Sequence, residues 1–172
     1  KVVLVTGAGN GIGAAAARAF AAEGAAVGVL DFDAESSVRV VSEIEAHGGR
    51  AIAISADVRR AADAELAVAR MIEAFGGLDI LVSNAGVVRY AEVPECSEDE
   101  WDLVIDTNLK GMFLMCKYAI PAMRSRGGGA IVNTASVQAF ASDQLLAAYC
   151  ASKGGVVSMT RAMALDHAKD SI

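Results

Sequence analysis

The fold is decided by Val2-Val3-Leu4-Val5-Thr6-Gly7-Ala8-Gly9-Asn10-Gly11-Ile12-Gly13, close to the start of the chain. Its first five residues are aliphatic or β-branched, as in a strand that is buried on both faces. The glycines that follow allow a tight turn with no Cβ atom against a ligand. Because a helical pattern begins at Gly11, the turn would present free N–H groups and a positive helix end to an anion. This order of strand, turn and helix predicts a site for a dinucleotide pyrophosphate.

Short apolar runs alternate with helical patterns along the rest of the chain. This alternation predicts right-handed crossovers and a parallel sheet with helices on both faces. The expected fold class is therefore α/β, a Rossmann-like doubly wound parallel sheet in a single domain over residues 1–172. The expected strands are Val2–Thr6, Ala26–Asp31, Ala51–Ser55, Asp79–Ser83 and Ala130–Ala135. The expected helices are Gly11–Glu23, Ala34–His47, Arg60–Phe75, Ser97–Arg124, which is long enough to divide near Asp106–Asn108, and Tyr149–Ala168.

Two glycine registers fit the turn. One is G-x-G-x-x-A at Gly9, Gly11 and Ala14, and the other is G-x-x-x-G-x-G at Gly7, Gly11 and Gly13. The second fits better because it starts where the strand ends. It predicts a cofactor-binding turn that also includes Asn10 and Ile12. The alternative is a glycine-rich turn that binds nothing.

An acidic residue at the end of the second strand predicts which dinucleotide is bound. Asp31 lies eighteen residues beyond Gly13, where a carboxylate can accept hydrogen bonds from the adenosine ribose. Its charge would repel a 2′-phosphate, and the first basic residue after it is Arg39. These features favour NAD over NADP, with Phe32 beside Asp31 as a further expected cofactor contact. The alternative reading of Asp31 is a simple turn residue.

Tyr149, Lys153 and Ser136 predict a site for proton transfer. Tyr149 and Lys153 are four residues apart, so a helix places them on one face. A free tyrosine is a poor base near neutral pH, and a neighbouring ammonium group favours its phenolate form. Ser136 follows the fifth expected strand, where its hydroxyl can reach a substrate oxygen at the carboxyl edge of the sheet. Each feature alone has a structural alternative, a helix-surface pair or an ordinary loop serine, and the combination favours an oxidoreductase.

Composition argues against several other classes of protein. The net charge of −6 argues against binding to nucleic acid, which attracts basic surfaces. There is no polybasic run or long apolar stretch for a membrane. The 3 cysteines are far apart, which suggests free thiols in a reducing compartment, and we expect a cytoplasmic protein without a metal site.

These motifs resemble those of the classical short-chain dehydrogenase/reductase family. Its glycine motif matches Thr6, Gly7, Gly11 and Gly13. The remaining motifs of the family fall, in order along the chain, on Asp57-Val58, Asn84-Ala85-Gly86, Asn108, Ser136, Tyr149 and Lys153. The residue before Asn84, often asparagine in the family, is Ser83 here.

The resemblance implies roles for these residues. Tyr149 would be the general acid and base, Ser136 would orient the substrate oxygen, and Lys153 would bind the nicotinamide ribose and tune Tyr149. Asn108 would hold a water molecule in a proton relay. Asp57 and Val58 would contact adenine, and Asn84, Ala85 and Gly86 would line the cofactor site. The family also predicts a homodimer or homotetramer.

Classical members of this family run to about 250 residues, a common size for one such domain. We therefore expect a chain truncated after the helix of Tyr149 and Lys153, without the last strands and the substrate lid. The predicted activity is hydride transfer between NAD and a secondary alcohol or ketone, with Gln138 and Gln144 also in the substrate pocket. Two alternatives remain: a noncatalytic dinucleotide-binding or scaffold protein, and an extended-type sugar-nucleotide epimerase or dehydratase. The fold does not choose the substrate.

Overall fold

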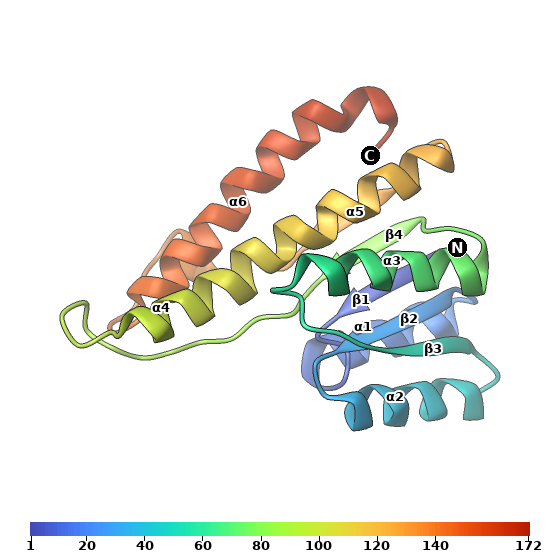
Figure 1. The fold of residues 1–172 in the computed structure, drawn as a ribbon, viewed down its shortest axis with the longest axis horizontal. Coiled ribbons are helices and arrows are strands. Elements are labelled where there is room, and N and C mark those ends of the chain that lie inside the picture. Colours follow the sequence, from blue (N-terminus) through green and yellow to red (C-terminus); the bar gives the residue numbers. More distant parts are fainter.

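A computed structural model describes residues 1–172, and its centre is one parallel sheet of five strands in the order β3-β2-β1-β4-β5 (Figure 1). The strands are β1 (Val2–Thr6), β2 (Ala26–Asp31), β3 (Arg50–Ser55), β4 (Ile80–Ser83) and β5 (Ala130–Asn133). The strand order reverses between β1 and β4, which pair directly with each other. In open α/β sheets, ligands bind beyond the carboxyl ends of the strands at such a reversal.

Helices cover both faces of the sheet (Figure 1). α1 (Gly11–Ala22) and α2 (Ala34–Ala46) lie on one face. α3 (Ala61–Phe75), α5 (Gly111–Ser125) and α6 (Ala147–His167) lie on the other face, and α4 (Glu98–Ile105) precedes α5. The fold is therefore the doubly wound α/β architecture that the alternating pattern predicts.

The sheet separates two hydrophobic cores, because successive side chains of a strand point to opposite faces. On one face, Val3 and Val5 of β1 pack with the alanines of α1. On the other face, Leu4 packs with Met71 of α3 and Met115 of α5. β1 is buried along its whole length, so its carboxyl end is a rigid base for the glycine turn. None of the helices has the length and apolar character needed to cross a membrane.

The sequence-based predictions of β1 and β2 agree with the structure residue for residue, whereas two other strands are shorter than predicted. β4 begins at Ile80. The preceding residue, Asp79, still bonds to the neighbouring strands through its backbone, and its side chain accepts hydrogen bonds from Val2 N–H and Arg126. β5 ends at Asn133 and does not continue to Ala135. Its neighbour β4 already ends at Ser83, so little backbone remains for β5 to pair with.

The helix predicted over Ser97–Arg124 is divided, as its length suggested. Ser97 caps α4 through a reciprocal capping box with Glu100, so the helix begins at Glu98. A π-helical turn, Asp106–Lys110, then joins α4 to α5, and Asn108 lies in its middle. π-turns occur frequently at functional sites. The last long helix, α6, begins at Ala147, two residues before the predicted start at Tyr149. The remaining helix and strand ends agree with the predictions or differ from them by one residue.

Candidate active site

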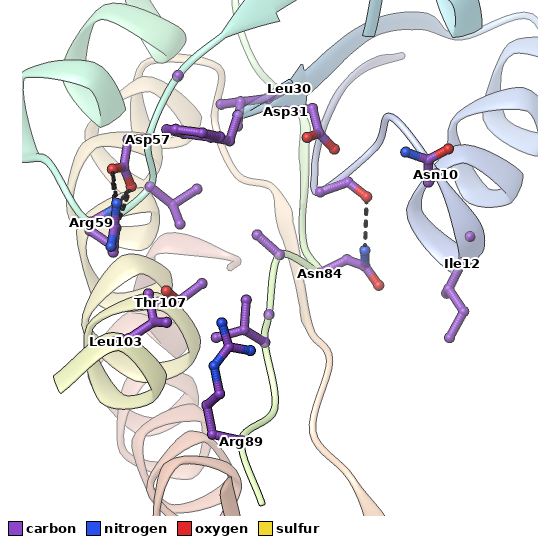
Figure 2. A pocket seen from close by; sticks show the side chains of 18 residues that line it. Asn10, Ile12, Leu30, Asp31, Asp57, Arg59, Asn84, Arg89, Leu103 and Thr107 are labelled. Atoms are coloured by element: carbon purple, nitrogen blue, oxygen red, sulfur yellow. Dashed lines mark hydrogen bonds and ion pairs between the residues drawn. The ribbon is translucent and has the colours of Figure 1, made fainter. Parts of the chain in front are cut away.

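A cleft of about 720 Å³ opens at the carboxyl edge of the sheet, above the reversal between β1 and β4 (Figure 2). Eleven of the predicted cofactor-binding residues line it: Gly7, Asn10, Gly11, Ile12, Asp31, Phe32, Asp57, Val58, Asn84, Ala85 and Gly86. They come from the ends of β1 to β4 and the segments after them, so the fold brings together positions that are far apart in the sequence. In Figure 2, Asn10 and Ile12 lie on one side of the cleft, and Arg59, Leu103 and Thr107 lie on the other.

Gly7, Gly11 and Gly13 of the glycine turn each have a different structural role. Gly7 has a φ of 62°, and a Cβ atom there would lie 2.8 Å from the Cα of Ala85. A Cβ atom on Gly13 would lie 2.1 Å from the carbonyl oxygen of Gly7, so Gly13 permits close packing of α1 and does not line the cleft. Gly11 has a φ of 54°, and a Cβ atom there would meet nothing within 4 Å. Gly11 therefore leaves open space at the start of the helix.

The amino terminus of α1 suits an anionic group. No side chain caps its first turn, and that turn contains no acidic residue. The first N–H groups of a helix have no partner within the helix, and they carry the positive end of its dipole. The turn therefore fits the pyrophosphate of a dinucleotide, which would bind to the N–H groups at Gly11 and Ile12.

Thr6 and Asn84 join the ends of β1 and β4 beneath the cleft. The hydroxyl oxygen of Thr6 accepts hydrogen bonds from the N–H groups of Asn84 and Ala85, both at 3.0 Å. The side-chain amide of Asn84 donates to the carbonyl oxygens of Thr6 and Gly7 at 3.2 and 3.3 Å. These contacts fix the Asn84-Ala85-Gly86 segment against the glycine turn.

Asp31 holds the glycine turn from the neighbouring strand. Its Oδ2 atom accepts a 2.8 Å hydrogen bond from Gly9 N–H, and its Oδ1 atom accepts a 3.0 Å bond from Asp33 N–H. A carboxylate has about four acceptor positions, so capacity remains for ribose hydroxyls. Phe32, at the rim of the cleft, is 73% exposed and offers an apolar surface there.

Asp57 lines the other side of the cleft and forms an ion pair with Arg59. The guanidinium of Arg59 donates to both carboxylate oxygens at 2.6 to 3.0 Å. This hydrogen-bonded pairing lowers the pKa of Asp57 below its ordinary value. Asp57 is therefore a fixed anion whose acceptor capacity is largely taken up by Arg59.

Asn108 connects the cofactor cleft to the helix of the proposed acid–base residue. Its Oδ1 atom accepts from Val87 N–H at 2.7 Å, and its Nδ2 atom donates to the carbonyl oxygen of Val87 at 2.9 Å. Nδ2 also donates to the hydroxyl of Ser152 at 3.1 Å, and Ser152 donates to the carbonyl oxygen of Tyr149 at 2.7 Å. The fully buried side chain of Asn108 thus positions both the segment after Gly86 and the first turns of α6.

Lys153 is a buried cation beside Tyr149. The residue is only 3% exposed, and its Nζ atom donates to the carbonyl oxygen of Thr134 at 2.7 Å. Nζ lies 5.7 Å from the centre of the Tyr149 ring and forms no ion pair with any carboxylate. Burial lowers the pKa of Lys153 because it disfavours the charged form. The ammonium group is therefore held by one neutral acceptor, the carbonyl oxygen of Thr134, next to a half-buried tyrosine.

The segment after β5 lies against the start of α6. Ser136 accepts a 3.2 Å hydrogen bond from Gln138 N–H and caps the short 3-10 turn Val137–Ala139. The side-chain oxygen of Gln138 accepts from the thiol of Cys150 at 3.9 Å, directly beside Tyr149 in the chain. Ser136 and Gln138 are thus brought near the Tyr149 helix. Gln144 lies in an exposed loop, and its side chain forms no hydrogen bond with this group.

Several residues of the site were missed by the sequence analysis. Arg59, Arg89, Leu103 and Thr107 line the cleft. Leu103 and Thr107 are four residues apart, just before Asn108, and this spacing could have indicated a shared face. Ser152, the partner of Asn108, stands inside the tyrosine–lysine motif itself. Arg89 could not be predicted as a site residue, because a single arginine in a loop is common.

Comparisons with known proteins identify the family of this chain. The family model for short chain dehydrogenases matches residues 1–172. The chain is 44% identical over 167 residues to an uncharacterized oxidoreductase of Thermotoga maritima, with 97% of this chain and 66% of that protein covered. It is 42% identical to meso-2,3-butanediol dehydrogenase of Serratia marcescens, with 100% of this chain and 67% of that protein covered.

A solved structure described as a 3-ketoacyl-ACP reductase from Sinorhizobium meliloti superposes with a TM-score of 0.97 at 39% identity. The match covers 100% of this chain and 69% of that one. The chain thus spans about two thirds of the length of the relatives that it matches. Because the family model covers the whole chain, and the relatives share its sequence as well as its fold, this chain belongs to the short-chain dehydrogenase family.

Proposed function

We propose that the protein is an NAD-dependent oxidoreductase that interconverts a secondary alcohol and a ketone, with Tyr149 as the general acid and base. The observation that carries this proposal is the buried Lys153 ammonium, 5.7 Å from the ring of Tyr149. A positive charge beside a phenol favours the phenolate, the form that accepts a proton from an alcohol. A tyrosine with only a structural role would gain nothing from a buried cation beside its ring.

The choice of NAD rests on Asp31. Its carboxylate is fixed at the rim of the glycine turn by Gly9 N–H and Asp33 N–H. It can accept from the ribose hydroxyls and would repel a 2′-phosphate. The glycine turn and the uncapped start of α1 would hold the pyrophosphate, and bound NAD would supply the hydride acceptor.

The remaining residues have supporting roles in this proposal. Tyr149 takes the proton of the alcohol at its phenolic oxygen, and the hydroxyl of Ser136 orients the substrate oxygen. Lys153 binds the nicotinamide ribose and favours the phenolate form of Tyr149. Asn108 positions the segment after Gly86 and holds a water molecule in the proton relay, with Gln138 at the substrate pocket.

The names of the relatives support a small alcohol as substrate. Besides the butanediol enzyme, the chain is 40% identical to a cyclohexanol dehydrogenase of Acinetobacter and 42% identical to a D-threitol dehydrogenase of Mycolicibacterium smegmatis. We infer that the substrate of this protein is a secondary alcohol or a vicinal diol.

We also infer a homodimer or homotetramer, in which α5 and α6 pack against another copy through exposed apolar side chains such as Phe113 and Leu165.

The test replaces Tyr149 in the intact protein. Tyr149→Phe keeps the ring and removes the hydroxyl, so we expect turnover of a secondary-alcohol panel with NAD to fall about 100-fold or more. NAD binding, measured by calorimetry, should persist. Tyr118→Phe is the matched control, because an exposed lysine, Lys117, lies 5.4 Å from the ring of Tyr118 without the buried site around it. Equal activity of the two variants would refute the role of Tyr149.

A further inference from the structure

The glycine turn contains a pair of residues that is chemically labile. Asn10 is exposed at the rim of the cofactor cleft, and Gly11 follows it directly. The chain has 4 asparagines, and Asn10 is the one that precedes a glycine. The other three are buried or half-buried and are followed by larger residues: Asn84, Asn108 and Asn133.

An asparagine before a glycine can lose its side-chain amide without an enzyme. The backbone nitrogen of Gly11 attacks the Cγ atom of Asn10, and the new N–C bond closes a succinimide ring. The Cγ–Nδ2 bond breaks, and Nδ2 leaves as ammonia together with the proton displaced from Gly11. Water then opens the ring and leaves aspartate or isoaspartate at position 10. Glycine favours the attack because it has no Cβ atom beside the nitrogen.

The attacking nitrogen is free in this structure. The N–H group of Gly11 lies at the start of α1 and has no hydrogen-bond partner in the protein, and the side chain of Asn10 does not cap the helix. A Cβ atom on Gly11 would meet nothing within 4 Å, so the chain has room to move there. The packing around Gly11 therefore does not oppose closure of the ring.

Contacts with α2 restrain Asn10 in an unreactive conformation. Its Oδ1 atom accepts from Arg39 at 2.8 Å, and its Nδ2 atom donates to the hydroxyl of Ser36 at 3.3 Å. The backbone of Asn10 is extended, with a φ of −148° and a ψ of 172°. A succinimide ring is nearly planar, so ψ must rotate from this value before the ring can close. A dinucleotide bound to the N–H groups of Gly11 and Ile12 would oppose that local rotation.

We propose that Asn10 is a site of spontaneous deamidation, and that its conversion lowers the affinity of the glycine turn for a dinucleotide. The inference rests on the proposed dinucleotide function of this cleft. Aspartate at position 10 puts a carboxylate at the N-cap of α1, where it stabilises the helix and repels a pyrophosphate. Isoaspartate also lengthens the main chain of the turn, which displaces the N–H groups of Gly11 and Ile12. Both products therefore weaken the cofactor site.

Peptide mapping by mass spectrometry tests the modification site. The intact protein is kept at mildly alkaline pH, with and without saturating NAD, and is then digested with trypsin. The peptide of residues 2–18 contains Asn10 and no other amide side chain. We expect this peptide to gain the mass of the acid before the peptides of the other asparagines do, and to gain it more slowly with NAD present. Calorimetry at the same time points should show NAD affinity falling in step with the conversion.

Two variants separate the chemical change from its effect on binding. Asn10→Asp carries the product charge from the start, so we expect it to bind NAD about 10-fold more weakly, because one anion is added beside the pyrophosphate. Its midpoint of urea unfolding should rise, because the added carboxylate favours the start of α1. Asn10→Ser is the matched control, since it keeps a polar side chain without an amide. Its NAD affinity, whatever the starting value, should stay constant with time.

Three results would overturn the inference. These are conversion of Asn10 no faster than that of the other asparagines, equal conversion with and without NAD, and undiminished NAD binding by Asn10→Asp. Failure of the unaltered protein to bind NAD at the outset would instead overturn the proposed function. The rates of conversion at the four asparagines would still decide whether Asn10 is the labile position.

Discussion

One charged side chain is buried at each edge of the sheet. The carboxylate at the amino edge has a charged partner, whereas the ammonium group at the carboxyl edge has none. At the amino edge, the Asp79 carboxylate accepts from Val2 N–H at 2.8 Å and from Arg126 at 3.0 Å. At the carboxyl edge, the Lys153 ammonium has the carbonyl oxygen of Thr134 as its acceptor and no carboxylate. Asp79 is 6% exposed and Lys153 is 3% exposed, so burial alone does not distinguish them.

The difference between the two charges lies in their partners, and it is reflected in their pKa values. The hydrogen bonds to Asp79 outweigh the effect of its burial, and the pKa of its carboxyl lies below the ordinary value. For Lys153, burial acts without a compensating anion, and its pKa is lowered. A buried cation without a counterion costs stability, and such groups persist where function uses them.

The largest expected effect follows replacement of the unpaired cation. Lys153→Met keeps much of the side-chain volume and removes the charge, so we expect turnover to fall about 100-fold or more. The same variant should be as stable as the unaltered protein or more stable, by about 1 kcal/mol, because the desolvation cost disappears. Alcohol oxidation and urea unfolding measure the two quantities.

Lys117→Met serves as its control, since Lys117 is exposed on α5 and also lies beside a tyrosine. This control should retain its turnover. A strong loss of stability in Lys153→Met would mean that Lys153 is a structural residue, and the contrast between the edges would fail.

A smaller effect is expected at the amino edge, on stability alone. Asp79→Asn keeps an acceptor for Val2 N–H but loses the charge that binds Arg126, so we expect a loss of about 2 kcal/mol. Arg126 is partly exposed, which keeps the effect moderate. Turnover per folded molecule should be unchanged. Asp102→Asn, an exposed carboxylate without an ion pair, is the control and should unfold like the parent protein.

The smallest expected effect is the pH dependence of the stability contributed by these two charges, and it is also the most specific test of them. The folded pKa of Asp79 lies below its ordinary value of 3.8, so its stabilising contribution is complete above that value and is lost as the pH falls through the folded pKa. The folded pKa of Lys153 lies below 10.5, so its destabilising contribution is present at neutral pH and disappears as the pH rises toward 10.5.

The stability difference between parent and Asp79→Asn should therefore shrink at acid pH. The difference between parent and Lys153→Met should shrink at alkaline pH. Urea unfolding midpoints across the pH range measure both. Stability differences that stay constant with pH would show that neither charge causes them.

The sequence predicted β1 and β2 well because these two strands are buried on both faces. A run such as that of β1 has no other stable place in a domain of this size, and the glycine turn fixes where it ends. The ends of β4 and β5 could not be predicted in the same way. β4 begins one residue after Asp79, whose side chain bonds to Arg126, a partner 47 positions away that no local pattern indicates.

Most residues that line the cleft were also predicted to lie together, because they follow strand ends and those ends meet at one edge. Arg39 and Arg89 were not, since long side chains reach the site from segments that carry no local signal. The role of Asn108 in the chain of contacts to Ser152 depends on a π-turn, and no period in the sequence indicates where a helix widens by one residue.

The hydroxyl of Thr6 has a mechanical consequence for the cleft. One oxygen receives two N–H groups from the end of β4, so β1 and β4 cannot separate without leaving both donors unpaired. These hydrogen bonds hold the ends of the two strands together beneath the cleft, and we expect the strands to stay together when a ligand binds. Entry and release must come from movement of the segments above the sheet, of which Val87 to Ser97 and the loop before α6 are the longest without regular helix. We therefore expect the rate of ligand exchange to depend on these upper segments and to be insensitive to the stability of the sheet.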